Sequence, residues 1–154
     1  MIKKDLIERL KEYEGTKSYQ RTKGYYKNGK FFSYKDSLGF ETIGYGHLVI
    51  DDIESFPDGI TEDEADSLLL TDIAIAQQGV QQLKLNLPPD SRWNDFLTIM
   101  VFQLGITKTK AFKRALAALS TANYATAIKE FKDSNWYKQT PHRLDSMIDY
   151  VLKG

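Results

Sequence analysis

The sequence of 154 residues has no cysteine, only two histidines and four prolines, and no long apolar run. Without cysteine there is neither a disulfide framework nor a thiolate zinc site, and two histidines offer little for an imidazole cluster, so we expect no metal and no cofactor. No segment approaches the roughly 20 apolar residues that span a membrane, and the charged amino terminus lacks a signal-peptide core. The composition, 42% apolar and 27% charged, is that of a globular domain.

An excess of charge of either sign is also missing, because 21 basic residues balance 21 acidic ones. The balance hides a segregation along the chain. Residues 16–35 carry six Lys or Arg and no acid, whereas residues 48–83 carry nine acids and no Lys or Arg. From residue 84 onward eleven basic residues face six acids. Positive and negative charges are therefore concentrated in different segments of the chain, and its overall neutrality does not exclude an anionic partner.

The first part of the chain changes from helical to strand-like patterning. Apolar residues at helical spacing predict a helix over 2–14, which Gly15 ends. The Asn28-Gly29 pair between aromatic flanks predicts a β-hairpin, and a further strand-like piece runs from Phe40 to Gly46. We expect a small antiparallel sheet here.

The remainder reads as helical. Thr61 and Glu64 form a capping box at the start of a long helix that runs to about residue 83. After Pro88-Pro89, Asp90 or Ser91 caps a helix through about Gln103. Shorter helices are predicted over 112–119 and 124–132, and Thr140-Pro141 caps and begins a last helix to about 152. The predicted fold is α+β and mostly α, one domain over 1–154 with a sheet lobe at about 15–60, a connecting helix at about 61–83, and a helical lobe at about 84–154 that includes the helix 2–14.

Two carboxylates stand at positions suited to acid–base chemistry. Glu14 lies at the carboxyl end of the first helix, where the helix dipole disfavours its ionised form and raises its pKa if the site is dry. A Glu of raised pKa is what protonation of a glycosidic oxygen requires. Asp36 lies in a turn between strands. Taken alone, the two are better explained as a solvated helix end and a turn former.

A longer pattern surrounds these residues. Glu14-Gly15 is followed by Tyr34-Lys35-Asp36, by Gly39 and by Thr42-Ile43-Gly44-Tyr45-Gly46-His47-Leu48. Later blocks are Met100-Val101-Phe102-Gln103-Leu104-Gly105, then Phe112, and Trp136-Tyr137-Lys138-Gln139-Thr140-Pro141-His142-Arg143. In these blocks, which cover both ends and the middle of the chain, the sequence resembles the T-even phage lysozymes, glycoside hydrolase family 24.

The resemblance implies a two-lobed lysozyme fold and a lysozyme (muramidase) activity that hydrolyses the β-1,4 bond between N-acetylmuramic acid and N-acetylglucosamine in peptidoglycan. The catalytic positions of the family fall on Glu14, Asp36 and Thr42. Glu14 would protonate the leaving oxygen, Asp36 would stabilise the cationic anomeric carbon and activate a water, and Thr42 would hold that water, as in an inverting hydrolase.

The resemblance also assigns supporting positions. Substrate-contacting positions fall on Leu48, Phe102 and Gln103, although Leu48 and Phe102 are equally consistent with core residues. Arg143 matches an arginine that pairs with the catalytic Glu. His47 and Asp72 match a stabilising ion pair. Trp136 reads as a core residue rather than a sugar platform.

Two departures from the family pattern stand out. Twenty-one residues separate Glu14 from Asp36, where the family has fewer than ten, and we attribute the excess to the basic hairpin at 20–33. Its cations would bind anionic wall polymer beside the cleft, dock a phage-tail component or regulator, or form only a solvated extension. In addition, Ala115 and Glu130 stand at two sugar-contact positions of the family.

Other functional classes fit less well. A lytic transglycosylase needs only one carboxylate, a wall-binding module would not keep Glu14, and nucleic-acid binding would rest only on cations interleaved with aromatics at 21–30. We expect a monomer made in a host cytoplasm that acts on peptidoglycan in the periplasm. As a phage endolysin it would depend on a separate membrane-permeabilising protein (a holin), and the alternative is a lysozyme domain of a tail protein.

Overall fold

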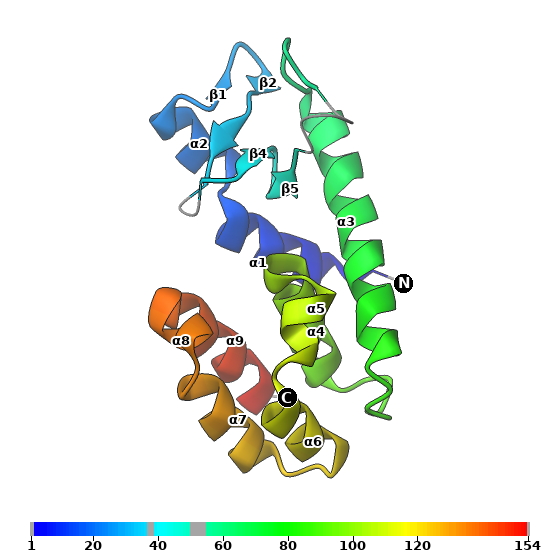
Figure 1. The fold of residues 1–154 in the computed structure, drawn as a ribbon. Coiled ribbons are helices and arrows are strands. Elements are labelled where there is room, and N and C mark those ends of the chain that lie inside the picture. The colour runs from blue at the N-terminus through cyan, green and yellow to red at the C-terminus, as the bar shows by residue number, and fades with distance from the viewer. Residues whose placement is uncertain (1, 37–38, 50–54, 154) are drawn as a thin grey trace. The chain divides into compact units, whose positions relative to one another are not determined.

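The computed structural model describes residues 2–36, 39–49 and 55–153, and the chain divides into two compact units, 1–74 and 75–154. Each unit is described by itself. The first holds two helices and five short strands: α1 (Lys4–Glu14), α2 (Lys17–Lys23), β1 (Tyr26–Lys27), β2 (Lys30–Phe31), β3 (Tyr34–Lys35), β4 (Glu41–Ile43) and β5 (His47–Leu48). The long helix α3 (Glu62–Gln82) begins in the first unit and ends in the second (Figure 1).

Helix α1 ends where the sequence predicts. Leu6 and Leu10, one helical turn apart, are fully buried. Gly15 adopts φ 113°, a conformation that side chains disfavour, and its amide donates to the Lys11 carbonyl at 3.0 Å. Glu14 is therefore the last residue of the helix.

The segment after Gly15 is a correction to the sequence analysis, because it begins with the helix α2 rather than with a strand. The Thr16 hydroxyl accepts the amide of Tyr19 at 3.1 Å, and Gly24 ends the helix with φ 85°. The predicted hairpin follows, and Asn28 and Gly29 both have positive φ (53° and 76°), as a tight two-residue turn requires. The excess over the family spacing is thus a helix and a hairpin, not a hairpin alone.

The strands form two sheets rather than the single one expected. β1 and β2 pair as an antiparallel hairpin, and β3, β4 and β5 form a three-stranded antiparallel sheet in that order. An isolated bridge joins Phe31 to Ile60, and Phe31 is fully buried with its ring 5.2 Å from that of Tyr45. Phe31 thereby connects the hairpin to the rest of the unit.

The capping box of α3 is present. The amide of Glu64 donates to the Thr61 hydroxyl at 3.2 Å, and the amide of Thr61 donates to the Glu64 carboxylate at 2.9 Å. These bonds lower the pKa of Glu64. On this helix Ala65, Leu69 and Ile73 are buried in the first unit. No helix within the described ranges is long and apolar enough to cross a membrane.

The second unit is a set of helices. Ser91 caps the first of them through a bond from the Trp93 amide at 3.2 Å, and Pro141 begins the last, as predicted, although the Thr140 side chain makes no capping bond. The short helices α5 and α8 were not predicted, because five residues carry too little periodicity. The helices are α4 (Arg92–Leu104), α5 (Ile106–Lys110), α6 (Lys113–Ser120), α7 (Tyr124–Lys132), α8 (Asn135–Gln139) and α9 (Pro141–Leu152).

An aromatic cluster forms the centre of the second unit. The Trp136 ring meets those of Phe96, Phe112 and Phe131 edge-on at centroid distances of 6.0–6.1 Å, and it is 3% exposed. The prediction that Trp136 is a core residue is confirmed. The fold is α+β and mostly α, with small antiparallel sheets, as the sequence indicates.

Candidate active site

Glu14, at the end of α1, lies against the backbone of the turn between β4 and β5. A Cβ atom placed on Gly46 would stand 2.6 Å from Glu14 Oε1 and 2.8 Å from its Cγ. Gly46 has φ 80°, so glycine is favoured here both by conformation and by lack of space. The carboxyl group of Glu14 thus lies against Gly46, at a position of the turn that has no room for a side chain.

A buried glutamine joins the two segments that meet at Glu14. Gln20, on α2, is 1% exposed, and its Nε2 donates to the Gly15 carbonyl at 2.9 Å and to the Gly44 carbonyl at 2.8 Å. Gly15 follows Glu14 directly, and Gly44 begins the turn that contains Gly46. Because buried amide hydrogen bonds are costly to leave unmade, Gln20 holds the end of α1 and this turn together.

Asp36 follows β3 and is held by its own turn. Its Oδ1 accepts the amide of Phe40 at 2.9 Å, and its amide donates to the Phe40 carbonyl at 2.9 Å. The amide of Gly39 closes the turn on the Asp36 carbonyl at 3.0 Å. The side chain is half-buried, and the bonds fix where the carboxylate stands.

The pKa of Tyr34 is affected by both Glu14 and Asp36. Burial, and then the negative charges of Glu14 and Asp36, raise the pKa of Tyr34 to about 12. Both carboxylates therefore lie within electrostatic range of the Tyr34 hydroxyl, although twenty-one residues separate them in the sequence.

Thr42 lies on the same face of the sheet as Tyr34. The two residues are directly opposite in the β3–β4 register, and Thr42 is also opposite Leu48 in the β4–β5 register, so the three side chains form one row across the sheet. Thr42 is 6% exposed, and its hydroxyl donates to the Phe40 carbonyl at 3.2 Å, which leaves its oxygen able to accept a hydrogen bond. Leu48 is 52% exposed.

The opposite face of this sheet carries a different contact. His47 is paired with Ile43 in the register, and its Nδ1 lies 2.8 Å from Asp72 Oδ2 on α3. Both side chains are mostly buried. The pair ties β5 to α3 on the face away from Thr42, which agrees with a stabilising role for it.

The other predicted residues lie in the second unit. Phe102 and Gln103 are half-buried near the end of α4, and Arg143 is half-buried on α9. Because they belong to a different unit from Glu14, their roles in substrate binding and in pairing stay predictions.

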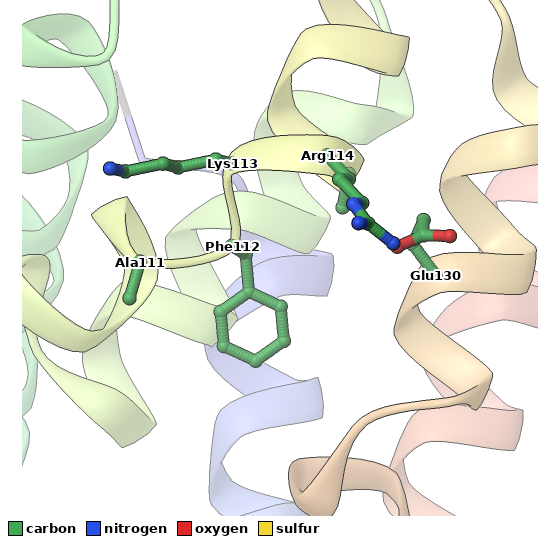
Figure 2. A pocket seen from close by; sticks show the side chains of 6 residues that line it. Ala111, Phe112, Lys113, Arg114 and Glu130 are labelled. Carbon is green, nitrogen blue, oxygen red and sulfur yellow. The ribbon is translucent and has the colours of Figure 1, made fainter.

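The second unit also has a pocket of about 270 Å³ at the start of α6. Its lining includes Phe112, Arg114, Ala115 and Glu130, and the side chains of Arg114 and Glu130 are directed toward one another (Figure 2). Ala115 and Glu130 stand at the two sugar-contact positions where the sequence departs from the family pattern. The aromatic wall and the two charged groups give the pocket both an apolar and a polar side.

The sequence analysis missed the roles of three residues. Gln20 joins the end of α1 to the turn after β4, Gly46 lies against Glu14, and Tyr34 has a pKa that both acids raise. The Gly-rich block around Gly46 was a visible signal. Gln20 had none, since a glutamine on an unpredicted helix looks like any surface residue. Chemically, a fixed carboxyl, a second carboxylate and a hydroxyl able to accept a bond are what acid–base hydrolysis through a bound water requires.

Comparison with known proteins agrees with this chemistry. A family model described as Phage lysozyme matches residues 11–149. The chain is 28% identical to probable T4-type lysozyme 1 and 30% identical to probable T4-type lysozyme 2 of Dictyostelium discoideum, each over 84% of this chain and 91% of the relative. It is also 28% identical to the pre-baseplate central spike protein Gp5 of Enterobacteria phage T4, over 79% of this chain and 25% of that protein.

The position of Tyr34 predicts a coupled titration. We expect Glu14→Gln to lower the pKa of Tyr34 from about 12, because it removes the carboxylate whose charge raises that pKa more than the charge of Asp36 does. Tyr45 is an internal control, since its pKa, also about 12, is raised by burial, Asp66 and Glu62. Ultraviolet titration of phenolate, with and without Tyr34→Phe, separates the two. An unchanged Tyr34 in Glu14→Gln would contradict the arrangement.

The raised pKa of Tyr34 also predicts that the protein becomes less stable at alkaline pH. Between the ordinary tyrosine pKa of 10 and about 12, the unfolded chain releases the Tyr34 proton while the folded chain keeps it. The free energy of unfolding therefore falls as the pH rises through this window, and Tyr34→Phe should reduce that fall.

Proposed function

The chain belongs to the phage lysozyme family of peptidoglycan-degrading glycoside hydrolases, and on that premise we propose that it cleaves the β-1,4 bond between N-acetylmuramic acid and N-acetylglucosamine. The observation that carries the proposal is that Tyr34, which is opposite Thr42 on one face of the sheet, lies within electrostatic range of both Glu14 and Asp36. Two carboxylates with a hydroxyl beside them suit glycoside hydrolysis through a water.

Glu14 is the general acid in this proposal. Protonated, it gives its proton to the glycosidic oxygen as the bond to the anomeric carbon breaks, so that the leaving sugar departs as a neutral alcohol. Its contact with the Gly46 backbone and the Gln20 clamp support this role, since they fix the carboxyl where only backbone stands behind it. Positioning of this kind is a large part of catalytic efficiency.

Asp36 and Thr42 act on the water. Asp36, ionised, stabilises the positive charge that develops on the sugar ring and accepts a proton from the attacking water. Thr42 accepts a hydrogen bond from the same water, since its own proton is engaged by the Phe40 carbonyl. The water oxygen bonds to the anomeric carbon on the face opposite the leaving group, and the configuration inverts. Proton exchange with solvent then returns Glu14 and Asp36 to their starting states.

We infer that the biological setting is degradation of a bacterial wall by a phage, in the periplasm, where peptidoglycan lies. Lysis from within and entry from outside use the same bond cleavage. Similarity to a phage spike protein supports the phage setting, and the site chemistry is the same in both cases.

Loss of the acid tests the assignment of Glu14. Glu14→Gln should lower the rate of clearing of permeabilised Gram-negative cells by about a hundredfold or more, because the amide has no proton to give. Glu12→Gln is the matched control, since it makes the same change at an exposed position of the same helix. Equal rates for the two variants would contradict the role.

The configuration of the product tests the mechanism. We expect the α-anomer as the first product, followed by mutarotation, and proton NMR early in turnover detects it. A β-anomer would show retention instead. A product lacking the added water, an anhydro sugar by mass spectrometry, would indicate a lytic transglycosylase.

Substitution of Gly46 tests whether the position of the Glu14 carboxyl determines the catalytic rate. Gly46→Ala places a Cβ atom 2.6 Å from Glu14 Oε1 and should lower kcat by about a hundredfold by displacing the carboxyl. Gly44→Ala is the control: it also has positive φ (64°), but its Cβ would meet Ala65 and Ile60 instead. Both variants should lose thermal stability. Similar loss of kcat in both would contradict a specific effect on Glu14.

A further inference from the structure

The helix α2, which the family spacing does not account for, has two unlike faces. At helical spacing Tyr19 and Lys23 stand one turn apart on one side, while Lys17 and Arg21 stand on the other. Lys17 pairs with Glu62 at 2.6 Å, and Arg21 lies over the ring of Tyr26, 5.4 Å from its centroid. On this side Lys17 is therefore engaged by a carboxylate, and Arg21, although exposed, lies against a ring of the hairpin.

The side with Tyr19 and Lys23 faces outward beside Glu14. Tyr19 is 55% exposed, and its Cδ2 is 3.4 Å from where a Cβ atom on Gly15 would lie, so the ring covers the residue that follows Glu14. Tyr19 therefore lies beside the end of α1 that carries Glu14.

Lys23 supplies the charge on this side. Its ammonium lies over the Tyr19 ring, 5.7 Å from the centroid. The side chain is exposed, and within residues 2–36, 39–49 and 55–153 it makes no ion pair with a carboxylate. Lys23 is thus a cation, next to an exposed aromatic ring, that is available to a ligand.

The hairpin is continuous with the site as well. The rings of Tyr25 and Tyr34 are stacked, with centroids 4.3 Å apart and planes inclined by 8°. Tyr25 is separated from Lys23, the last residue of α2, only by Gly24, so this stack holds the end of α2 against the strand that leads to Asp36. The exposed side of α2 that carries Tyr19 and Lys23 is therefore packed through Tyr25 onto the strand that leads to Asp36, and does not belong to a separate extension.

Resting on the proposed function, we propose that Tyr19 and Lys23 form an additional substrate-binding surface that takes an anionic glycan strand, with a sugar ring against Tyr19 and a carboxylate of the stem peptide paired with the Lys23 ammonium. The charge balance favours this ligand. A substrate that carries carboxylates is repelled by the ionised Asp36, and a cation beside the site offsets that repulsion as the strand enters. An aromatic ring next to the cation offers the apolar face of a sugar a partner.

The test compares the two sides of α2 in binding, without turnover. In the Glu14→Gln background, we expect Lys23→Gln to raise the Kd for purified sacculi about two- to fivefold, the size of an exposed ion pair, and Arg21→Gln to leave it unchanged. Co-sedimentation measures Kd. Tyr19→Ala should weaken binding and Tyr19→Phe should retain it. Thermal melts of each variant verify the fold.

The ligand is identified with sacculi whose carboxylates have been amidated. On these, Lys23→Gln and its parent should bind equally, and at high salt the difference on native sacculi should fade. Equal effects of Lys23→Gln and Arg21→Gln, or none, would overturn the proposal. So would a Lys23 effect that persists on amidated sacculi, as expected for docking of a different partner.

A failure of this proposal can be told apart from a failure of the proposed function. If Glu14→Gln clears cells as fast as the parent, the assignment of the acid fails while the binding comparison stands. If Glu14→Gln is inactive and the two sides of α2 behave alike, the hydrolase stands and the additional surface fails.

Discussion

The arrangement of the first unit depends on the side-chain amide of Gln20. Its two hydrogen bonds, to the carbonyls of Gly15 and Gly44, join a helix end to a strand turn in a place that water does not reach. Without them the carboxyl of Glu14 would have no fixed relation to Gly46 or to the sheet. Since a buried carbonyl deprived of its donor is costly, the two bonds determine geometry more than they add net stability.

The two faces of the three-stranded sheet carry different residues: one carries the proposed catalytic Thr42, and the other carries the contact of His47 with α3. Alternation of side chains along β4 sends Thr42 to the face shared with Tyr34 and Leu48, and Ile43 to the face shared with His47. The first face meets the two carboxylates, and the second is tied to α3 through Asp72. A shift of one residue in register would exchange these sets, so the turns that fix the register, with Gly39, Gly44 and Gly46 at positive φ, are part of the site.

The segment between Glu14 and Asp36 is integrated with the site rather than appended to it. Its helix provides Gln20, its hairpin provides the stack of Tyr25 on Tyr34, and Phe31 anchors it through a bridge to Ile60. Of the cations on α2, Lys17 is paired with Glu62, whereas Arg21 and Lys23 are exposed, each over a tyrosine ring. The overall neutrality of the chain therefore says little about the surface that an anionic wall polymer would meet.

Much of this protein was determined by the sequence itself. The end of α1 at Glu14, the Asn28-Gly29 hairpin, the capping box of Thr61 and Glu64, and the last helix from Pro141 follow from local hydrogen bonding and backbone preference, which act within a few residues. Trp136 was also predicted as a core residue, whereas the catalytic roles that the family blocks assign to Glu14, Asp36 and Thr42 stay predictions. Only the tertiary structure decided the contact of Glu14 with Gly46, the convergence of both acids on Tyr34, and the role of α2. These depend on burial and electrostatic contact between segments far apart in the chain, for which no local pattern of residues provides a signal.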